Sequence, residues 1–305
     1  MEQERGGERD VFLLFATRGT SAAPPTSVGR VLRDRGPRSK EGGRQSIVVV
    51  GTVITLIPMR SAWSLYLLLE LVAGARFGNP GCEPFGRASV VAAIEAMKEG
   101  KPIVVTDDES RENEGDLIMA GEHATADTIG FIIRHSSGVI CCSVPGERLD
   151  ALELPPMVVN NEDPKETAFT VSTDVKAGTS TGISAADRAA TFRALADPGA
   201  APGDFHRPGH VFPLRSRPGG VLARDGHTEA ALDFCRLAGC RPAGVLAEVC
   251  NDDGTMSRIP QLIPFCQEHG LVLTSIADLI AYIKEVEGAS AASSTMPSEA
   301  PSASA

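Results

Sequence analysis

A run of acidic residues restricts the fold of this chain more than any other segment, because so many carboxylates cannot be buried together. The run DDESRENEGD, from Asp107 to Asp116, holds six carboxylates around one arginine and directly follows the apolar residues 103–105. Crowded like charges repel and raise one another's pKa, so such a loop holds a hard divalent cation, pairs with arginine or shares protons. Taken alone, it also fits a solvated turn paired with its arginine. Its place after an apolar strand favours a functional loop, since rigid folds present functional groups where strands end.

A second polar segment lies far along the chain and contains Arg215–Gly220 (RSRPGG) and Arg224–Glu229 (RDGHTE). It offers arginines, a histidine and a hydroxyl group immediately before the predicted helix 229–238, which Thr228 is expected to cap and Gly239 to end. Helix N-termini attract anions through free N–H groups and the helix dipole. The two segments together predict a metal enzyme that acts on a phosphorylated substrate.

Four motifs, in one order between about residue 86 and about residue 287, closely resemble the 3,4-dihydroxy-2-butanone 4-phosphate synthase family of riboflavin biosynthesis. They are DDESRENEGD (107–116), RPGHVFPL (207–214), GHTEA (226–230) and NDDGTM (251–256). The resemblance implies a three-layer α+β fold and a homodimer with active sites near the subunit interface. It also implies conversion of D-ribulose 5-phosphate to L-3,4-dihydroxy-2-butanone 4-phosphate and formate, with Mg²⁺ or Mn²⁺ as the cofactor.

The resemblance assigns roles to particular residues of this chain. It implies Glu112 and His227 as the metal ligands, and one glutamate with one partner suits Mg²⁺, which keeps several waters. Read alone, His227 also fits a capping or core histidine. The substrate-binding residues that the resemblance implies, with 224–228 as the phosphate cradle, are Arg111, Glu112, Asp116, Arg224, Asp225, Gly226, His227, Thr228 and Glu248.

Four residues are candidates for acid–base catalysis. His210 is expected to be essential in the resembled family, although its local sequence also fits a buried histidine in a turn. Glu248 stands out on physical grounds, because a lone carboxylate in the apolar run 243–249 is costly to bury unless it is paired or protonated. A raised pKa would suit it for proton transfer. Glu114 and Cys141 are further candidates, and Cys141 also fits a buried thiol.

Helical and strand patterns alternate between the two ends of the chain. Apolar spacing and end signals predict helices near 90–97, 129–133, 229–238, 261–268 and 276–286, another starting at Ser184, and strands at 103–105, 139–144, 243–249 and 271–274. This alternation predicts an α+β fold with a mixed sheet covered by helices.

Three further segments have mainly structural interpretations. Arg188 is expected to pair with Asp187 or a neighbouring carboxylate. Residues 179–182 (TSTG) fit either an oxyanion site or a simple turn. Residues 251–254 (NDDG) predict a tight turn, because they lack the alternating ligands and terminal glutamate of a calcium loop.

Both ends of the chain differ in composition from the region between them. Residues 1–85 fit a targeting extension or a mis-assigned gene start, and the apolar stretch 47–75 is too interrupted for a typical membrane helix. The compartment stays open between plastid and cytoplasm. Residues 289–305 are rich in Ser, Ala and Pro and predict a disordered tail. We expect no fused GTP cyclohydrolase II domain after residue 286.

Charge and cysteine content exclude several classes of function. A net charge of −10 argues against a nucleic-acid-binding face, which disfavours a nucleotide-binding relative of the same fold. The seven cysteines contain no Cys-x-x-Cys pair, so neither a disulfide framework nor a zinc ribbon is expected. An inactive homologue with a structural role is the remaining alternative to the enzyme.

Overall fold

The computed structural model of the chain describes residues 46–49, 52–55 and 84–294. The chain divides into two compact units at residue 65, and each is considered by itself. In the first unit, β1 (Ser46–Val49) pairs antiparallel with β2 (Thr52–Thr55). Most of the apolar stretch 47–75 and the tail 295–305 lie outside the described residues. Within the described ranges, no helix is long and apolar enough to cross a membrane.

The second unit is built on a mixed seven-stranded sheet in the order β6-β7-β5-β8-β4-β3-β9. The pairs β3–β9 and β5–β7 are parallel, and the other four neighbouring pairs are antiparallel. The strands are β3 (Ile103–Thr106), β4 (Gly115–Ala120), β5 (Cys141–Pro145), β6 (Thr173–Val175), β7 (Phe205–Ser216), β8 (Gly244–Glu248) and β9 (Leu273–Ser275).

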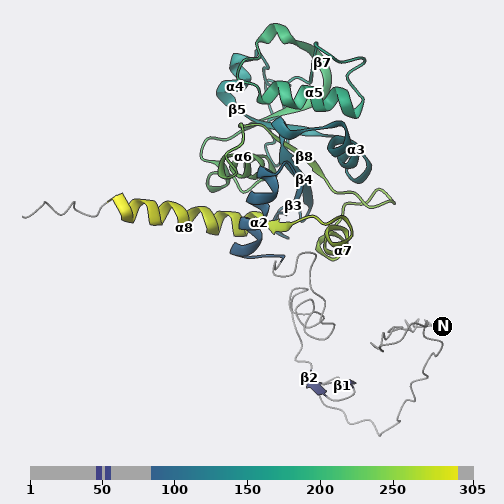
Figure 1. The fold of residues 1–305 in the computed structure, drawn as a ribbon, viewed down its shortest axis with the longest axis vertical. Coiled ribbons are helices and arrows are strands. Elements are labelled where there is room, and N and C mark those ends of the chain that lie inside the picture. The colour runs from purple at the N-terminus through teal and green to yellow at the C-terminus, as the bar shows by residue number, and fades with distance from the viewer. Residues whose placement is uncertain (1–45, 50–51, 56–83, 295–305) are drawn as a thin grey trace, which may run out of the picture. The chain divides into compact units, whose positions relative to one another are not determined.

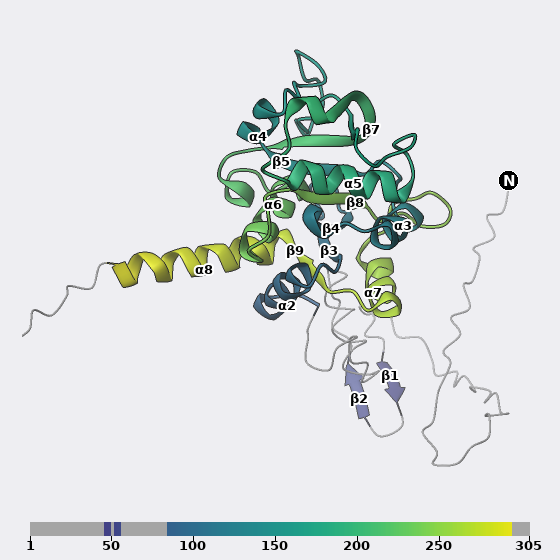
Figure 2. The same ribbon diagram turned by 45° about the horizontal axis from the view of Figure 1, so that its top comes forward.

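Helices cover both faces of this sheet because successive strand residues point to opposite sides. On β3, Val104 belongs to one apolar core, whereas Ile103 and Val105 belong to the other. The first core receives side chains from α3 (Ala126–His135), α5 (Ala185–Ala196) and α7 (Ile259–His269). The second receives them from α2 (Arg87–Lys98), α6 (His227–Leu237) and α8 (Ile276–Ser294). Figures 1 and 2 show α2 and α8 on one side of β3 and β4, with α3 and α7 on the other, and this arrangement confirms the predicted three-layer α+β fold.

Short elements complete the fold. They are η1 (Gly121–His123), α4 (Gly146–Ala151), η2 (Pro202–Asp204) and η3 (Gly220–Leu222). Helix α8 continues to Ser294, so residues 289–294 are helical where a disordered tail was expected. The tight turn at 251–254 is confirmed, because Asn251 N donates to Thr255 O and Gly254 has a φ of +84°.

Two predictions near the site were wrong. The local sequence around His210 was interpreted as a turn, but residues 207–214 lie within β7. Its 12 residues make β7 the longest strand of the sheet. Its two prolines make the sequence unlike that of a strand, since proline is usually excluded from central strands. Thr228 does not cap α6, because the helix begins at His227 and its N-cap residue is Gly226.

The loop before α5 is held by Asp187 and not by an arginine. The Asp187 carboxylate accepts hydrogen bonds from the Ser180 hydroxyl and from the N–H groups of Ser180 and Gly182. These N–H groups are therefore occupied, which favours the turn over the oxyanion site. The expected pair of Arg188 with Asp187 or a neighbouring carboxylate is not formed among the described residues, and the buried Nε of Arg188 has no hydrogen-bond partner there. Burial lowers the pKa of Arg188, and the charge of Asp174 opposes this only in part.

Candidate active site

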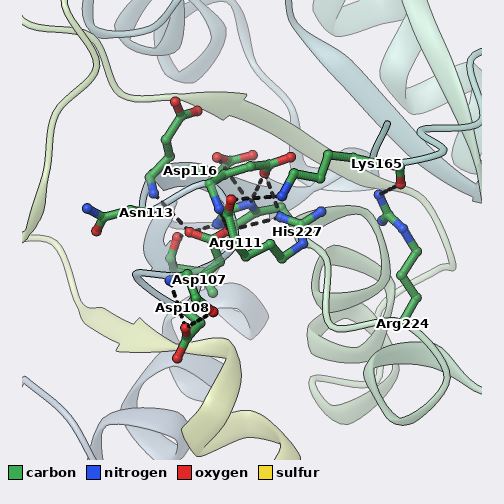
Figure 3. A network of polar contacts seen from close by, with 12 residues as sticks. Asp107, Asp108, Arg111, Asn113, Asp116, Lys165, Arg224 and His227 are labelled. Carbon is green, nitrogen blue, oxygen red and sulfur yellow. Dashed lines mark hydrogen bonds and ion pairs between the residues drawn. The ribbon is translucent and has the colours of Figure 1, made fainter. Parts of the chain in front are cut away.

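The acidic loop and the start of α6 meet at one end of the sheet. The loop joins β3 to β4, and register places Val105, Asp116 and Glu248 side by side across β3, β4 and β8. The His227 side chain bonds to the Val105 carbonyl, which brings α6 onto the same row. Figure 3 shows His227 and Asp116 beside the loop residues Asp107 and Arg111.

Asp107 organises the acidic loop. Its carboxylate accepts hydrogen bonds from Glu112 N at 3.0 Å, from Glu114 N at 2.8 Å and from the Arg111 guanidinium at 3.0 Å. The side chain is buried, so these donors replace the water that the charge gives up. Asp107 thereby fixes where the Glu112 and Glu114 side chains leave the loop.

The surroundings of His227 leave one imidazole nitrogen free for a cation. Nε2 lies 3.1 Å from Val105 O, and a carbonyl only accepts, so Nε2 carries a proton, and Nδ1 presents its lone pair when the ring is neutral. Nδ1 lies 3.7 Å from Glu112 Oε2 and 3.6 Å from Asp116 Oδ1, distances that are too long for hydrogen bonds. A backbone hydrogen bond that fixes the tautomer of a histidine is typical of metal ligands.

Asp116 supplies independent support for a bound cation. Its Oδ1 is buried and is one of two buried side-chain atoms in the described part of the chain that lack a hydrogen-bond partner. Ligand atoms of Asp107, Glu112 and His227 also lie within 4.8 Å of one another. An unpartnered carboxylate oxygen beside a glutamate and an imidazole lone pair fits a divalent ion such as Mg²⁺.

Three residues of the site have pKa values far from their ordinary ones. Burial raises the pKa of Asp116 to about 8. Burial lowers the pKa of His227, but the charge of Asp116 and the contact with Glu112 outweigh burial and raise it to about 9. Contact with His227, together with the charge of Arg111, lowers the pKa of Glu112 to about 2. Glu112 is therefore ionised and ready to bind a cation at neutral pH.

Arg111 and Glu114 face different partners within the loop. The Arg111 guanidinium bridges Asp107 and Glu112, 2.5 Å from the latter, so it neutralises the loop as well as facing the site. Glu114 lies 3.5 Å from Arg258, which also donates to the Glu112 and Asn113 carbonyls. Burial, followed by the charges of nearby glutamates and opposed by Arg258, raises the pKa of Glu114.

A basic hollow of about 360 Å³ adjoins the loop. Four cationic residues are among its lining residues, namely Arg111, Lys165, Arg217 and Arg224. Figure 3 shows the Lys165 side chain extending toward Arg111 and the Arg224 guanidinium beside the backbone of Lys165. Asp225 also lines the hollow, and α6 begins directly after Gly226. The first N–H groups of a helix have no partner within it, so this end of α6 suits an anion.

Arg224 and Thr228 are held more firmly than the sequence indicates. Arg224 pairs at 2.6 Å with the buried Glu229 and also donates to Lys165 O. The buried Ser143 hydroxyl donates to Thr228 O at 2.6 Å, which ties the first turn of α6 to β5. The phosphate cradle predicted at 224–228 therefore rests on a rigid support.

Glu248 does not have the environment predicted for it. It is the last residue of β8, is only partly buried, and accepts a hydrogen bond from the Ser137 hydroxyl at 2.8 Å. The deeply buried carboxylate of the row is its neighbour Asp116. Burial, aided by the charges of Glu248 and Asp116, raises the pKa of Cys141, so its thiol stays protonated near neutral pH and cannot act as a base.

His210 belongs to a different cluster. Its Nδ1 lies 2.7 Å from Asp174 Oδ2, and its backbone N–H donates to Asp174 Oδ1 at 2.8 Å. Cys141 of β5 pairs with Phe212 on β7 and with Leu246 on β8, the two strands that flank β5. His210 lies two residues from Phe212, and Glu248 lies two residues from Leu246. Two strand spacings put their backbones about 10 Å apart. The chain thus brings His210 to the same end of the sheet without joining it to the acidic loop.

Several residues of the site carry no sequence signal. Lys165 donates to Arg111 O at 2.8 Å, but it precedes α5 in an irregular segment with no motif. Arg258 and Asp174 likewise reach the site residues only through long-range folding. Asp107 stood within the acidic motif, but nothing in the run distinguishes the carboxylate that folds the loop from those that face the site.

Comparisons with known proteins agree with this geometry. A family model described as 3,4-dihydroxy-2-butanone 4-phosphate synthase matches residues 91–282. The synthase of that name from Agrobacterium fabrum is 56% identical over 197 residues, which cover 65% of this chain and 92% of the relative. The monofunctional riboflavin biosynthesis protein RIBA 2, chloroplastic, of Arabidopsis thaliana is 55% identical, and the match covers 66% of this chain and 43% of that protein.

Solved structures give the same result. A crystal structure of 3,4-dihydroxy-2-butanone 4-phosphate synthase in complex with two magnesium ions is 48% identical to this chain, with a TM-score of 0.63. The match covers 65% of this chain and 98% of that one. A synthase structure from Candida albicans is also 48% identical, with a TM-score of 0.60 over 64% of this chain and 96% of that one. The chain belongs to the 3,4-dihydroxy-2-butanone 4-phosphate synthase family.

Proposed function

We propose that this chain converts D-ribulose 5-phosphate to L-3,4-dihydroxy-2-butanone 4-phosphate and formate, using Mg²⁺ or Mn²⁺. The observation that carries the proposal is the His227 imidazole, whose Nδ1 faces Glu112 and the unpartnered Oδ1 of Asp116. A sugar phosphate with adjacent oxygens suits such a site, because magnesium sites combine few protein carboxylates with substrate oxygens.

The substrate phosphate binds in the basic hollow at the start of α6. Arg111, Lys165, Arg217 and Arg224 supply positive charge there, and the first turn of α6 supplies free N–H groups. The acidic loop adjoins the hollow through Ser110 and Arg111. A phosphate held there leaves the sugar carbons to extend toward Glu112 and Asp116.

Glu112 and His227 hold the divalent ion. When bound, the ion polarises the vicinal oxygens of the sugar and stabilises the negative charge that develops on them. Asp116 accepts a hydrogen bond from a substrate hydroxyl, which satisfies its otherwise unpartnered oxygen. Arg111 keeps Glu112 ionised and oriented.

Glu248 and His210 carry the proton transfers. Glu248 lies in the row of Asp116, and the Ser137 hydroxyl fixes its orientation. A proton next to the ketone is removed to give an enediol, and a hydroxyl group then leaves as water. After a skeletal rearrangement, a water molecule adds to the fourth carbon, which is expelled as formate. His210 is oriented by Asp174. Glu114 assists in the proton transfers. Cys141 is a protonated thiol, so it can assist only as a proton donor.

The active assembly is a homodimer in this proposal. His210 and Asp174 lie on the β6–β7 side of the sheet, apart from the acidic loop, so the His210 that serves a given site can come from the second copy. The compartment, plastid or cytoplasm, stays a prediction. The first 85 residues serve no catalytic role in this proposal.

The test follows the fourth carbon of the substrate. Ribulose 5-phosphate labelled with ¹³C at that carbon should give labelled formate with Mg²⁺, observed by NMR. The Glu112→Gln variant should release none, while keeping the wild-type circular dichroism spectrum. A folded wild-type chain that binds Mg²⁺ and ribulose 5-phosphate but releases no formate would instead support the inactive homologue.

A further inference from the structure

A second cluster of metal-binding side chains lies outside the proposed active site. It consists of Glu122, His123 and Cys240, each partly buried, and their ligand atoms all lie within 4.8 Å of one another. Glu122 and His123 belong to η1, which follows β4, whereas Cys240 follows the C-terminal end of α6. The proposed active site uses the opposite ends of the same two elements. An 11-residue helix is about 16 Å long, so the two sites are separate.

The backbone around this cluster is already fixed. Gly121 N donates to Ala243 O at 2.7 Å, which fastens η1 to the segment before β8. Arg241 N donates to Glu122 Oε1 at 2.6 Å and so orients the carboxylate. Hydrogen bonds that orient a ligating carboxylate are typical of metal sites. The three side chains are therefore brought together by the fold.

The charges near the cluster leave the ligand atoms available. The Arg241 guanidinium lies 3.5 Å from Glu122 but is shared with Asp197 at 3.6 Å, so its charge is divided between two carboxylates. The Cys240 thiol makes a long contact of 3.9 Å with Met97 O, which holds it weakly. Burial and the charge of Glu122 raise the pKa of this thiol, so a bound cation must displace its proton. Within the described residues, the His123 ring makes no hydrogen bond or ion pair that holds its nitrogens away from the cluster.

We propose that Glu122, His123 and Cys240 form a binding site for a soft divalent cation, of which Zn²⁺ is the physiological example. A thiolate, an imidazole and a carboxylate suit zinc, whereas magnesium prefers oxygen ligands alone. Three protein ligands leave the fourth tetrahedral position to water. Ligand atoms around a tetrahedral zinc ion lie about 3.5 Å apart, and those of the cluster lie within 4.8 Å, so the side chains close in by at most about 1.3 Å. On binding, the Cys240 thiol releases its proton to solvent and its sulfur bonds to the metal.

The ion would tie the end of α6 to the end of β4. These elements also carry His227 and Asp116 at their opposite ends, so the tie adds to the stability of the fold without contacting the proposed active site. Bound Zn²⁺ should therefore raise the Tm of the wild-type chain, since a ligand that binds only the folded state stabilises it. Catalysis does not require this ion, and turnover with Mg²⁺ should be the same in Cys240→Ser.

Cobalt reports on the site because a thiolate bound to Co²⁺ gives a near-ultraviolet charge-transfer band. The full chain, stripped with chelator, is titrated with Co²⁺, and a band that Zn²⁺ abolishes is expected. Cys240→Ser should lose the band, and Glu122→Gln and His123→Asn should each weaken Co²⁺ binding at least about tenfold. Circular dichroism establishes that each variant is folded.

Two control variants separate this cluster from other metal-binding groups. Cys250→Ser changes another partly buried free thiol outside the cluster and should keep the band. The double variant Glu112→Gln/His227→Asn removes the proposed active-site ligands and should keep it too. The proposal is overturned if the wild-type chain gives no band, if Cys240→Ser retains it, or if the double variant loses it.

Discussion

Asp116 lies directly opposite Glu248 in the antiparallel pairing of β4 and β8, and the two carboxylates differ sharply in environment. Asp116 is fully enclosed, and its Oδ1 has no hydrogen-bond partner, whereas Glu248 is partly exposed and accepts a hydrogen bond from Ser137. Opposite residues of a strand pair lie close enough to interact, so burial first, and then the charge of Glu248, disfavours ionisation of Asp116. The row therefore contains one carboxylate, Asp116, that tends to keep its proton, and another, Glu248, that accepts a hydrogen bond from the Ser137 hydroxyl.

The metal-free protein should lose stability as the pH rises, and Asp116 should be one cause. Burial raises its pKa to about 8 in the folded chain from the usual 3.8, so between these two pH values the folded state holds a proton that the unfolded state has released. The stability that Asp116 contributes is therefore fully present below pH 3.8 and is lost as the pH rises toward about 8. Asp116→Asn should gain Tm relative to wild type as the pH rises from 5 to 8 in EDTA, as scanning calorimetry can measure. A Tm difference that is constant with pH would contradict this origin.

Removal of the proposed metal ligands should abolish activity with little effect on the fold. Glu112→Ala and His227→Ala each delete one of the two proposed ligands, whose Oε2 and Nδ1 atoms lie 3.7 Å apart, and EDTA should have the same effect on the wild-type chain. Glu109 offers a matched control, since it is an exposed glutamate of the same loop. Formate release with added Mg²⁺ should survive in Glu109→Ala. Undiminished turnover of the wild-type chain after exhaustive chelation would rule out a metal-dependent reaction.

Local motifs predicted the functional loop and the start of α6, because each is contiguous in sequence. The relation between Asp116 and Glu248 was not predictable in this way, since it depends on the register of two strands far apart in the chain. Asp116 directly precedes an apolar run and Glu248 lies within one, and hydrophobic pattern alone does not reveal which one the neighbouring helix covers. The sequence therefore indicated a buried carboxylate correctly but assigned it to Glu248 instead of Asp116.

The strand that carries His210 was missed for a related reason. Pro208 and Pro213 interrupt the alternation that marks a strand, and the three-residue strand β6, which contains Asp174, is too short to predict. The pairing of β6 with β7 also includes a shift in register between Thr173 and Asp174. The Asp174–His210 contact exists only once this irregular pair has formed.

Asp174 should position His210 for its role. Nδ1 bonded to a carboxylate carries the proton, which leaves Nε2 as the acceptor. Asp174→Asn should lower kcat by about 10- to 100-fold, the range for losing a group that orients a functional histidine, and should shift the acid limb of the pH–rate profile. Asp204→Asn is the control, because that carboxylate only accepts from Ala201 N at the surface. Normal kcat and an unchanged pH profile in Asp174→Asn would exclude the positioning role.

The first residues of the chain should be dispensable for catalysis. The family match begins at residue 91, and α2 begins at Arg87. A truncated chain beginning at Asn79 should keep the full rate of formate release per active site. If it folds, as judged by its Tm and circular dichroism, but is inactive, residues before 79 contribute to the site.

Glu248→Gln should slow the reaction without weakening substrate binding. Glutamine keeps the shape of the side chain and can still accept from the Ser137 hydroxyl, but it cannot remove a proton. Loss of a positioned general base costs about 10²- to 10⁴-fold in rate. The Arg224 side chain and the first turn of α6 are unchanged, so the affinity for ribulose 5-phosphate should stay within a few fold. Single-turnover kinetics and calorimetric titration measure the two quantities separately.

Ser137→Ala is the matched control for this variant, because it removes the hydrogen bond and leaves the Glu248 carboxylate in place. It should lose far less rate than Glu248→Gln if the carboxylate itself takes the proton. Equal losses in both variants would mean that orientation alone matters. A large loss of affinity with normal turnover in Glu248→Gln would instead make Glu248 a substrate-positioning residue. Glu114, another partly buried carboxylate of this site, would then be the next candidate for the base.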